Sequence, residues 1–130
     1  MKKKLLGLAL LGAMMATLLV GCGSSGGKKG DTKDDVITIG FSQVGAESDW
    51  RTANSESMKS TFTKDNGYEL IFDDAQQKQE NQISAIRNFI QQDVDYIVLA
   101  PVTETGWDAV LGEAKQAGIP VIIVDRMVDV

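Results

Sequence analysis

Four short apolar runs, separated by segments with helical spacing, constrain the fold of this 130-residue chain more than any other feature. The runs are rich in β-branched residues, which is typical of strands buried on both faces. They are residues 36–41, 68–72, 95–100 and 121–124. Successive strands begin roughly 30 residues apart, the length of a strand–helix–strand unit. This order requires a parallel sheet with right-handed crossovers, so we predict an α/β fold with a doubly wound parallel sheet.

Each segment between two strands carries apolar residues on one predicted helix face. Asn66-Gly67 is expected to close the first helix, whereas Gly118 and Pro120 mark the end of the third. The predicted faces are Trp50, Ala53, Met58, Thr61 and Phe62; Ile83, Ile86, Phe89 and Ile90; and Trp107, Val110, Leu111, Ala114 and Ala117.

The start of the chain has the layout of a secretory signal. Three lysines at positions 2–4 precede an uncharged run, Leu5 to Gly21, and the only cysteine follows as Cys22. An uncleaved membrane anchor is the alternative, because the run is near the lower length limit for a span. Leu19-Val20-Gly21-Cys22 resembles the bacterial lipobox, whose cysteine becomes a lipid-modified N-terminus. We therefore expect residues 1–21 to be a lipoprotein signal peptide and Cys22 to be the lipidation site of an exported protein anchored to the cell membrane.

The composition of the residues after the signal indicates a tether before the folded domain and argues against several functions. Residues 22–35 are expected to form a flexible tether, since Gly23 to Asp35 contains no apolar residue. Only three of the 13 basic residues and none of the 18 acidic residues lie in the leader, so the mature part carries a formal charge of −8. This charge argues against nucleic acid as a partner. The chain has no histidine, which argues against zinc or copper sites and against histidine-based catalysis, so we expect no metal, no cofactor and no catalytic residue.

The fourth predicted strand lies six residues from Val130, and no further helix follows it. Such a strand would leave one sheet face bare. We therefore expect residues 36–130 to be part of a larger protein.

Ligands of open parallel sheets bind beyond the carboxyl ends of the strands. Three polar loop regions are expected there: residues 42–51, residues 73–81, and residues 101–107 together with Asp125-Arg126. The first suits a polyhydroxylated ligand, because sugars pair their hydroxyls with carboxylate or guanidinium groups and stack on aromatic rings. Its candidate residues are Gln43, Glu47, Ser48, Asp49, Trp50 and Arg51.

Most of these residues also have structural explanations. Trp50 could be core, Ser48 and Asp49 could cap a helix, and Glu47 could be a solvated charge. Core packing is favoured for Trp107, and an exposed polar helix start is favoured for the glutamines at 76, 77, 79 and 82. Asp125-Arg126 directly follows four aliphatic residues, so its position favours ligand contact over a structural salt bridge.

Several segments resemble the solute-binding components of ABC sugar importers, which are periplasmic-type sugar-binding lipoproteins. The likeness is to the ribose/galactose group, and within it to the galactofuranose-binding branch, and it runs from Val36 to the last residue. It is carried by residues 40–45, Glu47-Ser48, Trp50-Arg51, residues 74–82, Ala100-Pro101-Val102, Gly106-Trp107 and the strand ending in Asp125-Arg126.

The resemblance implies the N-terminal lobe of a two-lobed protein that binds a monosaccharide and delivers it to an ABC permease in the membrane. Asp125 and Arg126 would hold sugar hydroxyls. Glu47, Ser48, Trp50 and Arg51 would line the same cleft, and Gln43 would support it. Asp49 stands where the branch has a smaller residue, so the exact sugar is left open.

Two other functions are weighed beside this one. The same domain can feed a signalling partner as a sensor, and nothing in residues 36–130 separates the two roles. A glycosidase would pair Asp125 with Asp73, Asp74 or Glu47, but Arg126 beside Asp125 opposes the raised carboxyl pKa that such chemistry needs. A sugar-responsive repressor shares the fold but begins with a basic DNA-binding helix pair, whereas this chain begins with the predicted export signal.

Overall fold

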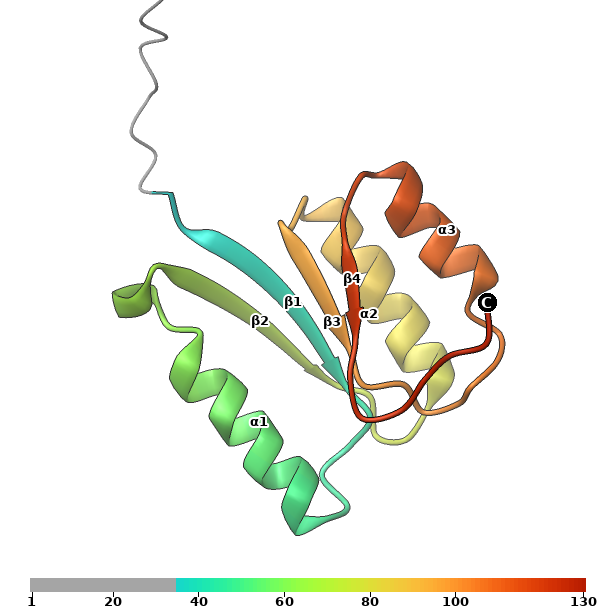
Figure 1. The fold of residues 1–130 in the computed structure, drawn as a ribbon, viewed down its shortest axis with the longest axis horizontal. Coiled ribbons are helices and arrows are strands. Elements are labelled where there is room, and N and C mark those ends of the chain that lie inside the picture. Colours follow the sequence, from blue (N-terminus) through green and yellow to red (C-terminus); the bar gives the residue numbers. More distant parts are fainter. Residues whose placement is uncertain (1–34) are drawn as a thin grey trace, which may run out of the picture. The chain divides into compact units, whose positions relative to one another are not determined.

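A computed structural model describes residues 35–130, which form a parallel sheet flanked by helices (Figure 1). The predicted signal peptide, Cys22 and the predicted tether before Asp35 lie outside the described residues. Within residues 35–130, no helix has both the length and the apolar character needed to cross a membrane. The elements are β1 (Ile37–Gln43), α1 (Asp49–Thr61), the 3₁₀ turn η1 (Lys64–Asn66), β2 (Tyr68–Asp74), α2 (Gln79–Gln91), β3 (Tyr96–Leu99), α3 (Asp108–Gln116) and β4 (Val121–Ile123).

The strands are all parallel and lie in the order β2-β1-β3-β4. The chain passes from β1 to β2 in one direction and then crosses back to β3 and β4 in the other. The loops after β1 and β3 therefore lead to opposite faces of the sheet, which creates a topological switch point between these two strands. The predicted α/β fold with a doubly wound parallel sheet is confirmed.

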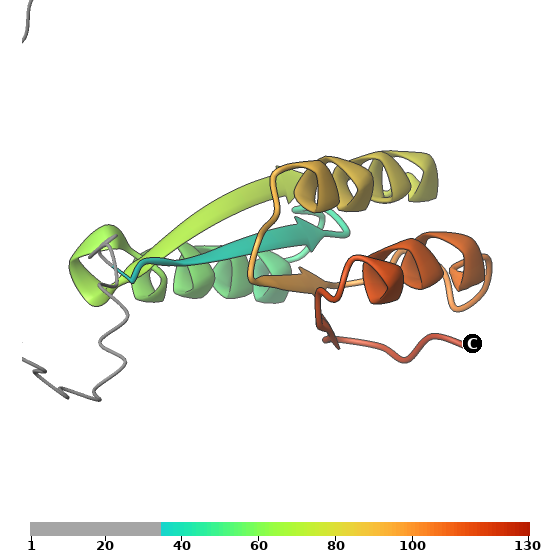
Figure 2. The same ribbon diagram turned by 90° about the horizontal axis from the view of Figure 1, so that it is seen from above.

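Two apolar clusters hold the helices against the two sheet faces. On one face, α2 and α3 place Phe89 and Trp107 against Ile97 and Leu99. The Phe89 ring lies so close to Gly40 that a Cβ there would overlap it. On the other face, α1 places Met58 and Phe62 over a cluster that contains Phe41 and Val98. Figures 1 and 2 show α1 and α2 on opposite sides of β1.

The orientation of α1 differs from the prediction. Met58 and Phe62 face the sheet as expected, but Trp50, Ala53 and Thr61 are exposed. The helix ends at Thr61, and Gly67, with a φ of 84°, closes the separate turn η1 instead. The other expected glycine stop is confirmed, because Gly118 follows α3 with a φ of 74°.

The fourth strand is also less buried than its aliphatic sequence predicted. Ile122 is 48% exposed, whereas Val121 and Ile123 are half-buried against the α2–α3 cluster. β4 pairs only with β3 within residues 35–130, and no described helix covers Ile122. The prediction of a fully buried fourth strand is therefore wrong for the described part of the chain.

Candidate functional site

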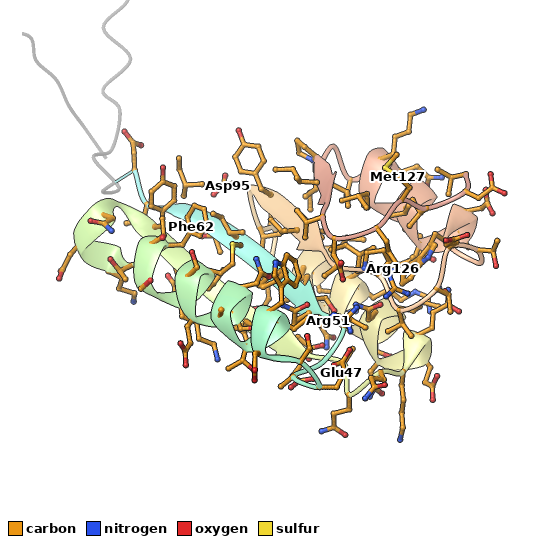
Figure 3. All side chains as sticks on the ribbon, turned by 60° about the horizontal axis from the view of Figure 1, so that its bottom comes forward. Glu47, Arg51, Phe62, Asp95, Arg126 and Met127 are labelled. Carbon is orange, nitrogen blue, oxygen red and sulfur yellow. The ribbon has the colours of Figure 1, made fainter. Side chains whose placement is uncertain are left out.

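Side chains that follow two strands, β1 and β4, meet beside the switch point. The loop after β1 provides Glu47, the first turn of α1 provides Arg51, and the segment after β4 provides Asp125 and Arg126. Figure 3 shows Glu47, Arg51 and Arg126 toward one end of the sheet, and Phe62 and Asp95 toward the other. We call the group of Glu47, Ser48, Trp50, Arg51, Asp125 and Arg126 the binding rim.

Arg51 joins two carboxylates that are far apart in sequence. Its Nε and Nη2 both donate to Asp125 Oδ2, over 3.3 and 3.0 Å, and its Nη1 forms an ion pair with Glu47. The side chains of Arg51 and Asp125 are only 15% and 22% exposed. Because partial burial reduces solvent screening, this pairing fixes the start of α1 and Glu47 before it against the segment after β4.

Asp125 occupies a sharp backbone turn at the end of the sheet. Val124 N–H donates to Leu99 O over 3.0 Å, which extends the hydrogen bonding between β3 and β4 by one residue. Arg126 N–H then donates to Val124 O over 2.9 Å. The enclosed Asp125 has a φ of 73°, so the turn is a γ-turn of the rare, strained kind. Both bonds from Arg51 reach Oδ2, which leaves Oδ1 available to accept from a ligand.

Arg126 is exposed and makes no ion pair within the described residues. Its Nη1 donates to the Val102 carbonyl over 3.1 Å. A guanidinium has five N–H donors in a planar fork, so most remain free. Arg126 and Asp125 also line a small hollow of about 160 Å³ beside Met127.

The start of α1 combines a structural role with open polar and aromatic groups. Ser48 is the N-cap, and its Oγ accepts from Arg51 N–H over 3.2 Å, so the capping interpretation is confirmed for Ser48 but not for Asp49, which is the first residue of α1. The hydroxyl proton stays free to donate elsewhere. Trp50 is 56% exposed; the interpretation of Trp50 as core is therefore wrong, and its ring is open to solvent.

Gln43 is inside the protein rather than on the rim. It is the last residue of β1 and is fully buried, so the predicted loop begins later than expected. Its Nε2 donates to Asn54 Oδ1 over 2.9 Å and to Ser55 Oγ over 3.1 Å, and its Oε1 accepts from Val44 N–H. These bonds draw a polar face of α1 to the sheet, which explains why α1 is rotated relative to its apolar pattern.

Asp73 and Asp74 belong to β2 rather than to the loop predicted to contain them. Ser42 pairs with Asp73 in the β1–β2 register. Burial and the negative charge of Asp74 raise the pKa of Asp73 above its ordinary value of 3.8, and together they outweigh the neighbouring Ser42 hydroxyl, which lowers it. Asp73 lies on β2, and β1 and β3 separate β2 from β4, which precedes Asp125 of the binding rim.

The rim has the chemistry of a hydroxyl-recognition site: free carboxylate oxygens, guanidinium donors and an exposed indole, at the edge where open parallel sheets bind ligands. Residues 39–129 match the family model described as periplasmic binding protein domain. The chain belongs to this family. Its sheet order, strand directions and helix placement are those of one lobe of a periplasmic binding protein.

Three similar proteins bind furanose sugars according to their descriptions. The galactofuranose-binding protein YtfQ of Escherichia coli (strain K12) is 55% identical over 94 residues, which cover 72% of this chain and 29% of YtfQ. The binding protein of the arabinose ABC transporter from Shewanella sp. ANA-3, solved with α- and β-L-arabinofuranose, is 62% identical with a TM-score of 0.69. A Mycobacterium smegmatis protein solved with β-D-fucofuranose is 63% identical with the same TM-score. Each structural match covers 72% of this chain and 31% of the solved chain.

The chain thus spans about a third or less of the length of these periplasmic binding proteins. The expected resemblance to a sugar-binding protein of the galactofuranose branch is confirmed at the level of family and relatives.

Some residues behind the rim were not singled out as site residues from the sequence. Gly45 is buried where a Cβ would collide with the Glu47 carboxylate, so a larger residue would displace Glu47 from Arg51. Gln82 is fully buried and forms hydrogen bonds to the backbone of Ala100 and Val102 after β3, so its predicted exposure is wrong. Gln79 is half-buried. Trp107 is fully buried and donates through Nε1 to Thr103 O over 2.9 Å, which confirms its core assignment.

Proposed function

We propose that residues 36–130 form the N-terminal lobe of the solute-binding component of an ABC sugar importer, with a monosaccharide in its furanose form as ligand. The observation that carries this proposal is the bonding of Arg51 to Asp125, which unites two distant segments into one polar rim. The furanose ligands of two of the most similar structures support the choice of ring form.

In this proposal the rim captures the sugar without making or breaking a bond. Asp125 Oδ1 accepts from a sugar hydroxyl, and the free N–H groups of Arg126 donate to neighbouring oxygens. Trp50 covers an apolar face of the sugar ring, and Glu47 and Ser48 form hydrogen bonds to the remaining hydroxyls. Gln43 supports α1 through its hydrogen bonds to Asn54 and Ser55. A second lobe then closes over the ligand, and the closed form is what the permease recognises.

The proposal places the protein outside the cytoplasm, held to the membrane through lipid on Cys22. The family supports export, and the residues around Cys22 support the anchor. The partner is an ABC permease, which is favoured over a signalling partner because one of the most similar structures belongs to an arabinose ABC transporter. Cys22→Ser should move the protein from the membrane fraction to the soluble exported fraction, and unchanged membrane association would contradict the anchor.

The ligand is tested by calorimetry on the two-lobed protein that we propose for this chain. The panel is L-arabinose, D-galactose, D-fucose, D-ribose and D-fructose, with the ring-locked methyl D-galactopyranoside as control. Free galactose should bind with an apparent affinity reduced by its small furanose fraction, whereas the locked pyranoside should not bind. Equal binding of galactose and its locked pyranoside would contradict furanose selection, and no binding by any sugar would contradict the function.

A second assay separates capture from catalysis. Incubation with a chromogenic galactoside is expected to release no chromophore, because the proposed capture involves no bond cleavage. Release of chromophore that is lost in Asp125→Asn would instead support the glycosidase, in which Asp125 is one of the paired carboxylates.

A further inference from the structure

A buried glutamine of α2 holds together the two strands on either side of the switch point. Gln82 is fully buried. Its Nε2 donates to Ala100 O after β3 over 2.8 Å and lies 3.5 Å from Ser42 O in β1. Its Oε1 accepts from Val102 N–H over 2.8 Å. One amide side chain therefore satisfies two backbone groups of the segment after β3 and also lies against the end of β1, whose Ser42 O accepts from Ala100 N–H over 3.0 Å.

Gln82 and Arg126 both form hydrogen bonds to the backbone of Val102. Val102 N–H donates to Gln82 Oε1 over 2.8 Å, and Val102 O accepts from Arg126 Nη1 over 3.1 Å. Gln79 supports the same loop, since its Nε2 donates to Thr105 O over 2.8 Å. The position of the Arg126 guanidinium is thus linked through Val102 to the interior of α2.

We propose that Gln82 is a positioning residue, which orients Arg126 toward the ligand by fixing Val102. This inference rests on the proposed sugar-binding function. Gln82 does not reach the rim itself, because it is buried beneath the strand ends.

The position requires an amide because it needs a donor and an acceptor at once. Methionine has nearly the same length but offers no N–H donor and only a weak acceptor. Gln82→Met would leave the Val102 N–H and the Ala100 carbonyl without partners in a buried place, so the loop would shift to find others. Ionised glutamate keeps the acceptor for Val102 and loses the donor for Ala100.

A double-mutant cycle on the two-lobed protein tests this link. The variants are Gln82→Met, Arg126→Ala and the combination of both, and affinity for L-arabinose or the best sugar of the panel is measured by calorimetry. We expect Gln82→Met to weaken binding roughly five- to thirty-fold. The double variant should bind within about two-fold of Arg126→Ala, because Gln82 acts through Arg126.

Asn81→Ala is the matched control. Asn81 precedes Gln82 on α2 and donates to Ala75 O over 3.0 Å, and it has no hydrogen bond to the loop that holds Arg126. Urea unfolding of every variant separates lost stability from lost affinity. Asn81→Ala should lower stability but leave the affinity unchanged. Wild-type affinity in folded Gln82→Met, or independent effects that multiply in the double variant, would overturn the proposal.

A second measurement needs no sugar, so it distinguishes failure of this inference from failure of the proposed function. Amide hydrogen exchange at Val102 should be faster in Gln82→Met and unchanged in Asn81→Ala. An unchanged rate in Gln82→Met overturns the positioning role whatever the sugar panel shows. If Gln82→Met does not fold, Gln82→Glu replaces it, and its affinity relative to wild type should recover at acid pH, where the protonated carboxyl regains a donor. Absence of that recovery would also overturn the role.

Discussion

At the scale of single residues, the two arginines of the rim, Arg51 and Arg126, differ in their burial and in their bonding partners. Arg51 is committed to two carboxylates and is mostly buried. Arg126 is exposed and makes one bond to a backbone carbonyl. In the proposed function, a ligand would meet a fixed frame built around Arg51 and a free set of donors on Arg126.

Arg126→Ala should weaken sugar binding in the two-lobed protein by roughly 1.5–3 kcal/mol, the scale of hydrogen bonds to charged groups. Calorimetry measures the loss. Arg87→Ala is the control, because Arg87 bonds Glu113 on the exposed side of α2 and α3, over 2.9 and 2.8 Å, away from the rim. Affinity that is unchanged in Arg126→Ala would contradict its role.

Asp73 makes the stability of the domain depend on pH. Its pKa is higher in the folded state than in the unfolded chain, because burial and Asp74 disfavour the charged form. The folded state therefore binds the proton more tightly, and stability falls as pH rises from 3.8 through the raised pKa. Asp73→Asn should be more stable than wild type at pH 7, and this gain should vanish near pH 3. Urea unfolding at both pH values measures it, and an equal difference at both would refute the assignment.

The sequence predicted the rim residues better than their supports. Asp125 and Arg126 follow a strongly apolar run, so their place at a strand end could be inferred from local pattern alone. Gln82 could not be placed in this way, because a glutamine in the first turn of a helix is usually solvated. Which backbone groups need a buried amide partner depends on the tertiary arrangement of β1, β3 and α2.

At the scale of elements, the order of strands and helices followed from periodicity, but the rotation of α1 did not. Apolar spacing placed Trp50 and Thr61 toward the sheet, whereas the helix turns Asn54 and Ser55 inward to meet Gln43. A hydrogen-bonded polar contact has no hydrophobic period, so the pattern of apolar residues cannot reveal it. The same rotation leaves Trp50 exposed.

Two glycines in different elements should respond oppositely to alanine. In β1, a Cβ at Gly40 would overlap the Phe89 ring of α2, so Gly40→Ala should lower the free energy of unfolding by about 1–3 kcal/mol. In α3, nothing lies within 4 Å of a Cβ at Gly112, so Gly112→Ala should raise it by about 0.5–1 kcal/mol. Urea unfolding measures both. A stabilised Gly40→Ala would show that α2 does not depend on this close approach.

At the scale of the whole molecule, the sheet order places the rim and the apolar faces at different parts of the domain. The switch point lies between β1 and β3, and the rim forms beyond their carboxyl ends. An apolar groove of about 310 Å³ lies on the α1 side of the sheet, with Ile37, Tyr96 and Ile122 among its lining residues. The polar rim and the exposed apolar groove thus lie on different parts of the domain.

The apolar groove should make residues 36–130, without the predicted signal peptide and tether, self-associate. Ile122 is 48% exposed on β4, which is an edge strand of the described sheet, and exposed apolar surface beside an unpaired strand edge favours association. Ile122→Thr removes apolar area from the groove while keeping a β-branched residue in the strand, so it should lower the average mass seen by sedimentation equilibrium at high protein concentration. Met127→Thr is the matched control, because Met127 is 79% exposed but lies outside the groove. If both substitutions lowered the mass equally, association would reflect general surface hydrophobicity rather than this face of the sheet.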